Sequence, residues 1–128
     1  MGPRRTATTG AAAAALLAGT ALGAPLASAA DITAPTVPTG LRQIGTSQGQ
    51  DVYGWDASYD DTGVSWYAIR LDGQMVRKDT KRTQQVRVYD LYLYCHAMPG
   101  HSYSLTIDAV DAAGNHSAPS KAVTITVH

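Results

Sequence analysis

The sequence predicts an all-β protein built as a two-layer antiparallel sandwich, and three observations support this. First, glutamate and phenylalanine are absent, whereas valine, threonine, tyrosine and glycine are frequent, a composition that disfavours long helices. Second, apolar and polar residues alternate from Tyr103 to Ala109, which is the period of a strand with one buried face. Third, turn signals such as Asp72-Gly73 separate a series of short segments of this kind.

The strands can be placed in order along the chain. Two prolines keep residues 31–38 extended, either as a first edge strand or as a stiff linker. The first pairing is expected to begin at Leu41 and Ile44, and residues 45–49 are expected to form a loop. Further strands are predicted over residues 50–55, 64–71, 74–78, 85–89, 103–109 and 122–127. Seven short strands at this spacing indicate a seven-stranded antiparallel immunoglobulin-like sandwich.

Strand alternation assigns the aromatic residues to faces of the sheets. Tyr53 and Trp55 lie two positions apart and should face inward together, with Trp55 as the central aromatic residue of the core. In the following strand, Tyr67 is placed on one face with Ile69 and Leu71. The other face of that strand is predicted to carry three residues, namely Trp66, Ala68 and Arg70.

Residues 1–30 are predicted to be a secretory signal peptide, and residues 31–128 a single small domain. Residues 1–5 form a short basic region with Arg4 and Arg5, residues 11–27 are mostly apolar, and Ala27-Ser-Ala29 has the small-residue pattern that signal peptidase cleaves. The Arg4-Arg5 pair makes export by the twin-arginine route an alternative, although the apolar pair that usually follows the two arginines is missing. No later stretch is long and apolar enough to span a bilayer. We expect a secreted, extracellular protein from which the signal peptide has been removed.

The net charge and the single cysteine indicate which partners and which oligomeric state to expect. The chain has ten basic and ten acidic residues, and loss of two arginines with the signal leaves 8 − 10, a net charge of about −2. This argues against a specific nucleic-acid partner. Cys95 is the only cysteine, so it is either buried as a small apolar side chain or bridges two chains. The protein is expected to be a monomer, with a dimer through Cys95 as the alternative.

Five motifs are spread over nearly all of residues 31–128: Ala34-Pro-x-x-Pro-x-Gly-Leu41, Trp55, Tyr67-x-Ile-x-x-Asp-Gly73, Pro99-Gly-x-x-Tyr103 and Ala109-Val-Asp-Ala-Ala-Gly-Asn-x-Ser-Ala-Pro-Ser120. Together they resemble a fibronectin type III domain, of the kind found in secreted bacterial polysaccharide-degrading enzymes. The last motif is the most specific. The resemblance implies that Tyr103 is a tyrosine-corner residue, whose hydroxyl ties back to the upstream connection.

Three features depart from the family pattern. Asp51 stands where an inward apolar residue is usual, and Trp66 stands where a small residue is common. The connection over residues 90–98 is several residues longer than usual. It carries Tyr92, Tyr94, Cys95 and His96. Because binding residues concentrate on loops held by a rigid scaffold, the individual function is expected at this connection.

No assembled catalytic site is predicted. Asp60-Asp61 has the residue types of a glycosidase pair, but neighbouring residues of an extended loop tend to point apart. The Gly-x-Ser-x-Gly elbow of serine hydrolases is absent. A possible metal set matches no common zinc spacing: Cys95, His96, His101 and His116. We therefore expect no metal, no other cofactor and no enzymatic activity.

Two groups of residues are candidates for ligand binding. Trp66, Tyr92 and Tyr94 offer flat rings for sugars or a protein partner, although the longer connection could instead fold over Trp66 and cover it. The second group is a basic run that could steer an anionic polymer, comprising Arg77, Lys78, Lys81, Arg82 and Arg87. The alternative for this run is an edge strand charged to block pairing with another sheet.

These observations predict a secreted, non-catalytic binding or spacer module. Its partner would be a polysaccharide, a cell-wall polymer or another extracellular protein. The alternative, implied by the resemblance alone, is an accessory module of polysaccharide degradation associated with a glycoside hydrolase. The predicted ligand-binding residues are Trp66, Tyr92, Tyr94, Arg77, Lys78 and Arg82. The predicted structural residues are Trp55, Tyr67 and Tyr103.

Overall fold

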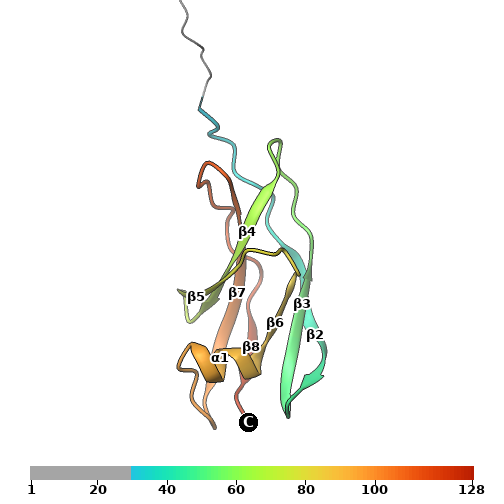
Figure 1. The fold of residues 1–128 in the computed structure, drawn as a ribbon, viewed down its shortest axis with the longest axis vertical. Coiled ribbons are helices and arrows are strands. Elements are labelled where there is room, and N and C mark those ends of the chain that lie inside the picture. Colours follow the sequence, from blue (N-terminus) through green and yellow to red (C-terminus); the bar gives the residue numbers. More distant parts are fainter. Residues whose placement is uncertain (1–29) are drawn as a thin grey trace, which may run out of the picture. The chain divides into compact units, whose positions relative to one another are not determined.

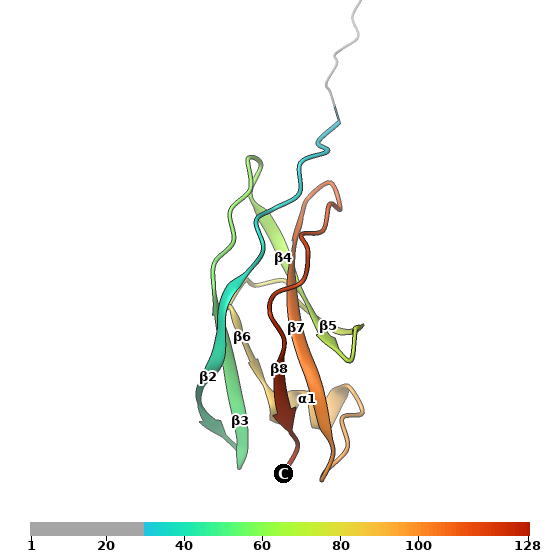
Figure 2. The same cartoon turned by 180° about the vertical axis from the view of Figure 1, so that it is seen from behind.

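A computed structural model describes residues 30–128, which form two antiparallel sheets packed face to face (Figures 1 and 2). The predicted signal peptide, residues 1–30, lies outside the described residues apart from Ala30. Within the described range, no helix is long and apolar enough to cross a membrane. The predicted fold class, a seven-stranded antiparallel sandwich of the immunoglobulin type, is confirmed for this range.

One sheet has three strands in the order β2–β3–β6. Their bounds are Thr39–Ser47 for β2, Gln50–Asp56 for β3 and Gln85–Arg87 for β6. The expected loop over residues 45–49 is wrong for its first three residues, because residues 45–47 continue the pairing of β2 with β3. The turn is reduced to Gln48 and Gly49, with φ angles of 56° and 78°. A glycine suits the second position because it enters this left-handed region without steric cost.

The other sheet has four strands in the order β5–β4–β7–β8. Their bounds are Gln74–Asp79, Val64–Leu71, Ser102–Asp111 and Val123–Thr126 respectively. The predicted turn Asp72-Gly73 joins β4 to β5, with φ angles of 52° and 85°, as a type I′ hairpin requires. Asp72 also fixes this turn to β7, because its carboxylate accepts a hydrogen bond from the Ser104 backbone N–H (2.8 Å).

Trp55 and Tyr67 face each other across the core, one from each sheet. Trp55 is 3% exposed, and its ring meets that of Tyr67 edge-on, with 5.5 Å between the ring centroids and 69° between the ring planes. Apolar side chains from both sheets surround this pair, including Ile69, Leu71, Val86, Leu105, Ile107 and Ile125. They occupy the inward positions that strand alternation assigns to the core.

Two tyrosine hydroxyls attach connections to the strands that follow them. The Tyr67 hydroxyl accepts a hydrogen bond from the Ser58 backbone N–H (2.9 Å), which fixes the loop before β4. The Tyr103 hydroxyl accepts one from the Met98 backbone N–H (2.9 Å), which fixes the connection before β7. The second bond has the geometry of a tyrosine corner.

A short helix, α1 (Val88–Tyr94), replaces the end of the strand predicted over residues 85–89 and part of the irregular connection after it. Val88 and Leu91 are three positions apart, so they share one helical face, and both are fully buried. Asp90 lies in the first turn, where a negative charge is favourable, and pairs with Arg87. The predicted strand is therefore wrong beyond Arg87.

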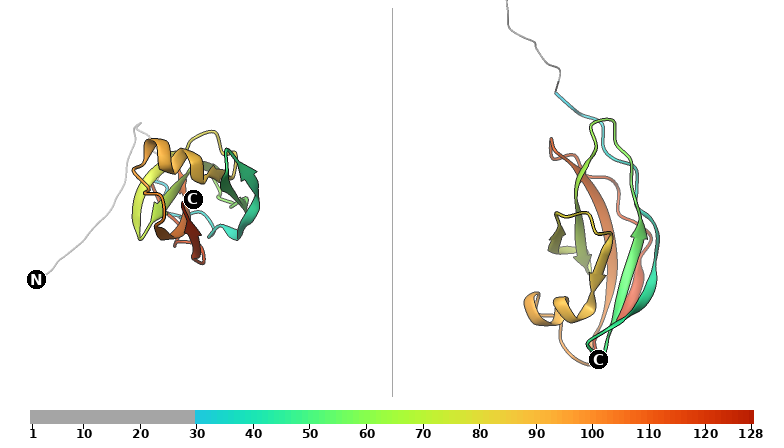
Figure 3. Two further views of the ribbon diagram at one scale, coloured as in Figure 1. Left: turned by 90° about the horizontal axis from the view of Figure 1, so that it is seen from below. Right: turned by 45° about the vertical axis from the view of Figure 1, so that its right-hand side comes forward.

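The position of α1 closes one end of the open side of the sandwich. The helix packs against β3 and β6 (Figure 3). Cys95, which follows it, is half-buried, and its thiol donates a hydrogen bond to the Val76 carbonyl of β5 (3.4 Å). The connection after β6 thus bridges from the three-stranded sheet to the edge of the four-stranded sheet.

Candidate binding surfaces

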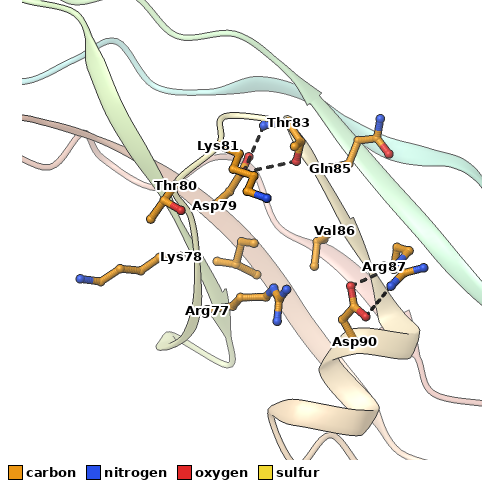
Figure 4. Close-up of a pocket in the computed structure, with 11 residues that line it drawn as sticks. Arg77, Lys78, Asp79, Thr80, Lys81, Thr83, Gln85, Val86, Arg87 and Asp90 are labelled. Carbon is orange, nitrogen blue, oxygen red and sulfur yellow. Dashed lines mark hydrogen bonds and ion pairs between the residues drawn. The ribbon is translucent and has the colours of Figure 1, made fainter.

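A groove of about 420 Å³ lies between β5 and β6. Figure 4 shows β5 on one side, β6 on the other, the loop of residues 80–84 at the upper end and α1 at the lower end. β5 and β6 are edge strands of the two sheets, so the groove lies where the sandwich is open. Two buried apolar side chains, Ile69 and Val86, form its base. Polar groups on its walls include Thr80, Thr83 and Gln85.

Asp79 organises the loop above this groove. The Asp79 side chain is buried, and its carboxylate accepts hydrogen bonds from the Thr83 backbone N–H (3.1 Å), the Thr83 hydroxyl (3.3 Å) and the Gln84 backbone N–H (2.8 Å). Arg82 and Gln84 have positive φ angles of 53° and 59°, which residues other than glycine rarely adopt. The Asp79 bonds therefore stabilise a loop conformation that the backbone alone does not favour.

Arg77 and Lys78, which the sequence analysis placed in one basic group, lie on opposite faces of β5 because successive strand residues alternate in direction. Arg77 is directed toward the groove, whereas Lys78 extends away from it (Figure 4). The Lys78 ammonium lies 4.5 Å from the centroid of the Trp66 ring, on the outer face of the sheet. Arg77 therefore belongs to the groove, and Lys78 belongs mainly to a second surface around Trp66.

The other basic residues of the run also have distinct positions. Lys81 lines the groove and, like Arg77, forms no ion pair with any described residue. Arg82 is directed elsewhere, since its Nη1 donates to the Ser65 carbonyl oxygen (3.1 Å). Arg87 lines the groove but pairs with Asp90 through bonds of 2.8 and 3.0 Å, and this contact raises the pKa of Arg87. The groove thus has two unpaired cations and one paired cation.

Trp66 is half-buried on the outer face of the four-stranded sheet. Lys78 lies over its ring, and the His116 ring meets it edge-on with 5.6 Å between centroids and 88° between planes. The Lys78 contact is a cation–π interaction. Part of the Trp66 side chain remains accessible beside these two neighbours, so the surface around Trp66 is a second candidate for binding.

The structure does not bring Trp66 together with Tyr92 and Tyr94. Trp66 pairs with Val110 near one end of β7, whereas the connection after α1 reaches Tyr103 near the other end. Val110 and Tyr103 are seven residues apart along β7, which corresponds to a distance of roughly 23 Å. Tyr92 and Tyr94 are exposed, and the Tyr92 ring lies 6.3 Å from that of Tyr89 within α1. The expectation that the two tyrosines form one set with Trp66, as ligands or as a cover, is therefore wrong.

The sequence does not predict the polar cluster beside Trp66, in which Arg70 and His116 contact the buried carboxylate of Asp108. The Asp108 carboxylate accepts hydrogen bonds from Arg70 Nε (2.7 Å) and lies 2.6 Å from His116 Nδ1. The hydrogen bond to Asp108 raises the pKa of Arg70. Strand alternation places Arg70 and Asp108 on the same outer face, so the register of β4 with β7 is the signal that reveals this pair. His116, which follows the turn, was not predictable in this way.

Three carboxylates converge near the start of the described chain. Side-chain oxygens of Asp31, Asp60 and Asp111 lie within 4.8 Å of one another, whereas Asp61 is not part of this cluster. The Thr62 hydroxyl bonds both Asp31 and Asp60 (2.8 Å each), and the Asn115 amide donates to Asp111 (2.8 Å). Carboxylate oxygens are the ligands that Ca²⁺ prefers, so these are the described residues that could hold a metal.

The pKa of the Asp111 carboxyl group is lower than its ordinary value, and the surroundings of the group explain this shift. Burial alone would raise the pKa of Asp111, but hydrogen bonds from the Asn115 side chain and backbone, together with other hydrogen bonds, lower the pKa overall.

The histidines and the cysteine that the sequence analysis considered as metal ligands do not come together. His116 contacts Asp108, whereas Cys95 contacts the Val76 carbonyl.

Comparisons with known proteins place similar segments inside larger enzymes. No protein-family model matches the chain. It is 36% identical over 95 residues to chitinase A1 of Niallia circulans, covering 74% of this chain and 12% of the chitinase. It is 36% identical over 96 residues to exoglucanase B of Cellulomonas fimi, covering 75% of this chain and 8% of that protein. The chain thus spans only a small part of the length of these relatives.

The solved structures agree with this comparison at the level of the fold. The fibronectin(III)-like modules of CbhA from Clostridium thermocellum match with a TM-score of 0.52 and 20% sequence identity. The match covers 75% of this chain and 47% of the CbhA chain.

Proposed function

The chain belongs to the fibronectin type III domains that occur in polysaccharide-degrading enzymes, and from this premise we propose that it is a non-catalytic accessory module of polysaccharide degradation. The observation that carries the proposal is the similarity of about three quarters of the chain to segments of a chitinase and an exoglucanase. Chitin and cellulose are polymers too large to enter a cell, which supports an extracellular site of action. The predicted signal peptide agrees with that location.

The arrangement of the carboxylates supports a role without catalysis. A glycosidase holds two carboxyl groups about 5 to 9.5 Å apart on either side of an accessible bond. The converging group of Asp31, Asp60 and Asp111 includes one residue, Asp111, that is only 1% exposed. The groove contains two other acids, but Asp79 is bonded to its own loop and Asp90 is paired with Arg87. Surface recognition is the function that these residues favour.

The accessible aromatic surface at Trp66 provides the first test of the proposal. We expect the purified protein to co-sediment with insoluble chitin or cellulose, and Trp66→Ala to lower the affinity about two- to tenfold, because one aromatic contact is lost. Tyr59→Ala is the matched control, since Tyr59 is an exposed aromatic residue on the loop before β4 and should change retention little. Protein that stays in the supernatant with every polysaccharide would contradict binding and favour a spacer or a module with a protein partner.

A further inference from the structure

We propose that the groove between β5 and β6 binds an anionic sugar of an acidic polysaccharide, with Arg77 and Lys81 as the contacts to its negatively charged group. This inference rests on the proposed function and names the class of ligand. Arg77 and Lys81 line the groove and form no ion pair among residues 30–128. A guanidinium group can bind a carboxylate or a sulfate through two parallel hydrogen bonds, and an ammonium group adds a second positive charge.

The acids near the groove do not neutralise these two cations. The Asp79 carboxylate is occupied by three hydrogen bonds from its own loop, and Asp90 is paired with Arg87. Without Lys78, which extends toward Trp66, the three cationic and two acidic side chains around the groove give a local net charge of 3 − 2 = +1. This surplus contrasts with the chain after residue 30, whose net charge is about −2.

Protection of an edge strand does not account for this charge. β8 is the other edge strand of the same sheet, and its sequence Val-Thr-Ile-Thr has no charged side chain. If charges were needed to block edge pairing in this domain, β8 would need them as well. The cations of the groove moreover come from β5, from the loop after it and from β6, and they converge on one hollow.

The remaining lining suits a sugar ring. Ile69 and Val86 close the base of the groove with buried apolar side chains, while Thr80, Thr83 and Gln85 offer donors and acceptors for the hydroxyl groups of a sugar. The volume of about 420 Å³ is within the range of about 300 to 1,000 Å³ that is usual for small-ligand sites. The Asp79 bonds hold the loop in place before a ligand arrives, which lowers the entropic cost of binding.

A glycan fits this site better than a nucleic acid does. Two unpaired cations in one groove of a chain with a negative net charge are too few to follow a phosphate backbone, which requires an extended basic surface. The pattern matches recognition of a single anionic group on a polymer that is otherwise hydroxylated.

The test measures the affinity of the purified protein for soluble polygalacturonate, dextran sulfate, neutral dextran and a DNA duplex. We expect binding to polygalacturonate, to dextran sulfate or to both, and the arm that binds identifies the anionic group as carboxylate or sulfate. Arg77→Gln and Lys81→Gln should each weaken this binding about tenfold, because a charge-assisted contact is lost. Lys121→Gln is the matched control, since Lys121 is exposed, unpaired within the described residues and distant in sequence from the groove, and it should change affinity less than about twofold.

Several results would overturn the inference. These are equal weakening by Lys121→Gln and Lys81→Gln, equal binding of neutral dextran, tighter binding of DNA, and no binding of either polyanion. Retention on chitin or cellulose without binding to polyanions would refute the groove inference alone and leave the proposed function in place. Absence of binding to every polysaccharide, neutral or acidic, would refute the groove inference and also any direct polysaccharide recognition by the module, leaving a spacer or a module with a protein partner.

Discussion

Trp55→Ala is expected to lower the free energy of unfolding by about 4 kcal/mol, the largest effect of any substitution considered for this chain. Trp55 is 3% exposed and contacts Tyr67 edge-on at the centre of the core, so its removal leaves a cavity as well as losing apolar burial. Urea denaturation followed by far-ultraviolet circular dichroism measures the change. If the alanine variant does not fold, Trp55→Phe should still be measurably destabilised, by a smaller amount.

Trp66→Ala is the matched control for this prediction, because it removes the chain's other tryptophan from the outer face of the other sheet. Its expected cost is about 1 to 2 kcal/mol, from partial loss of burial and of the Lys78 contact. A smaller destabilisation by Trp55→Ala than by Trp66→Ala would contradict the assignment of Trp55 to the core. The control also shows whether Trp66→Ala is folded when it is used in the sedimentation experiment.

Leu91→Ala is expected to lower the free energy of unfolding by about 3 kcal/mol. Leu91 is fully buried and belongs to the hydrophobic core, although it lies on the short helix and not on a strand. For a domain of this size the change corresponds to a fall in melting temperature of about 10 °C or more. Thermal unfolding by differential scanning calorimetry measures it.

Leu93→Ala provides the control within the same helix. Leu93 is 47% exposed, so the same substitution two residues away should change stability by less than about 1 kcal/mol. Equal effects of the two substitutions would mean that α1 is a peripheral feature. A large effect of Leu91→Ala alone would mean that the longer connection is an integral part of the fold.

Much of the sandwich could be predicted because its strands have a strong local pattern. Val64–Leu71 was predicted with its bounds, since alternation and the Asp72-Gly73 turn specify both the period and the end of the strand. The first strand was predicted too short, because Gly45 and its polar neighbours resemble a loop until their pairing with β3 is known. The length of such an edge strand depends on which residues pair with it, and the sequence of the strand alone does not show this pairing.

The helix could not be predicted from its own residues. The segment Val88–Tyr94 is rich in tyrosine and leucine and contains a β-branched residue, all of which are compatible with a strand. Its helical character depends on Val88 and Leu91 finding a common apolar surface at β3 and β6. Tertiary packing therefore decides between two local structures that have similar propensities.

The candidate sites were only partly predictable for a related reason. The sequence located the basic stretch, but only the orientation of β5 shows that Arg77 faces the groove and Lys78 faces Trp66. Likewise, the grouping of Trp66 with the tyrosines of the connection failed because the two lie at different levels of β7. Composition identifies residues capable of binding, whereas strand register determines which of them act together.

We propose that this domain contributes to polysaccharide degradation by recognition, and that the groove between β5 and β6 is the surface that binds an anionic sugar. Heteronuclear NMR titrations with a soluble oligogalacturonate and with a sulfated dextran oligosaccharide provide the sharpest test, because each backbone amide reports on its own surroundings. With at least one of these ligands we expect saturable shifts concentrated in the amides of residues 77–87. Shifts confined to β8 and the residues before it, or no shifts at any concentration, would contradict it.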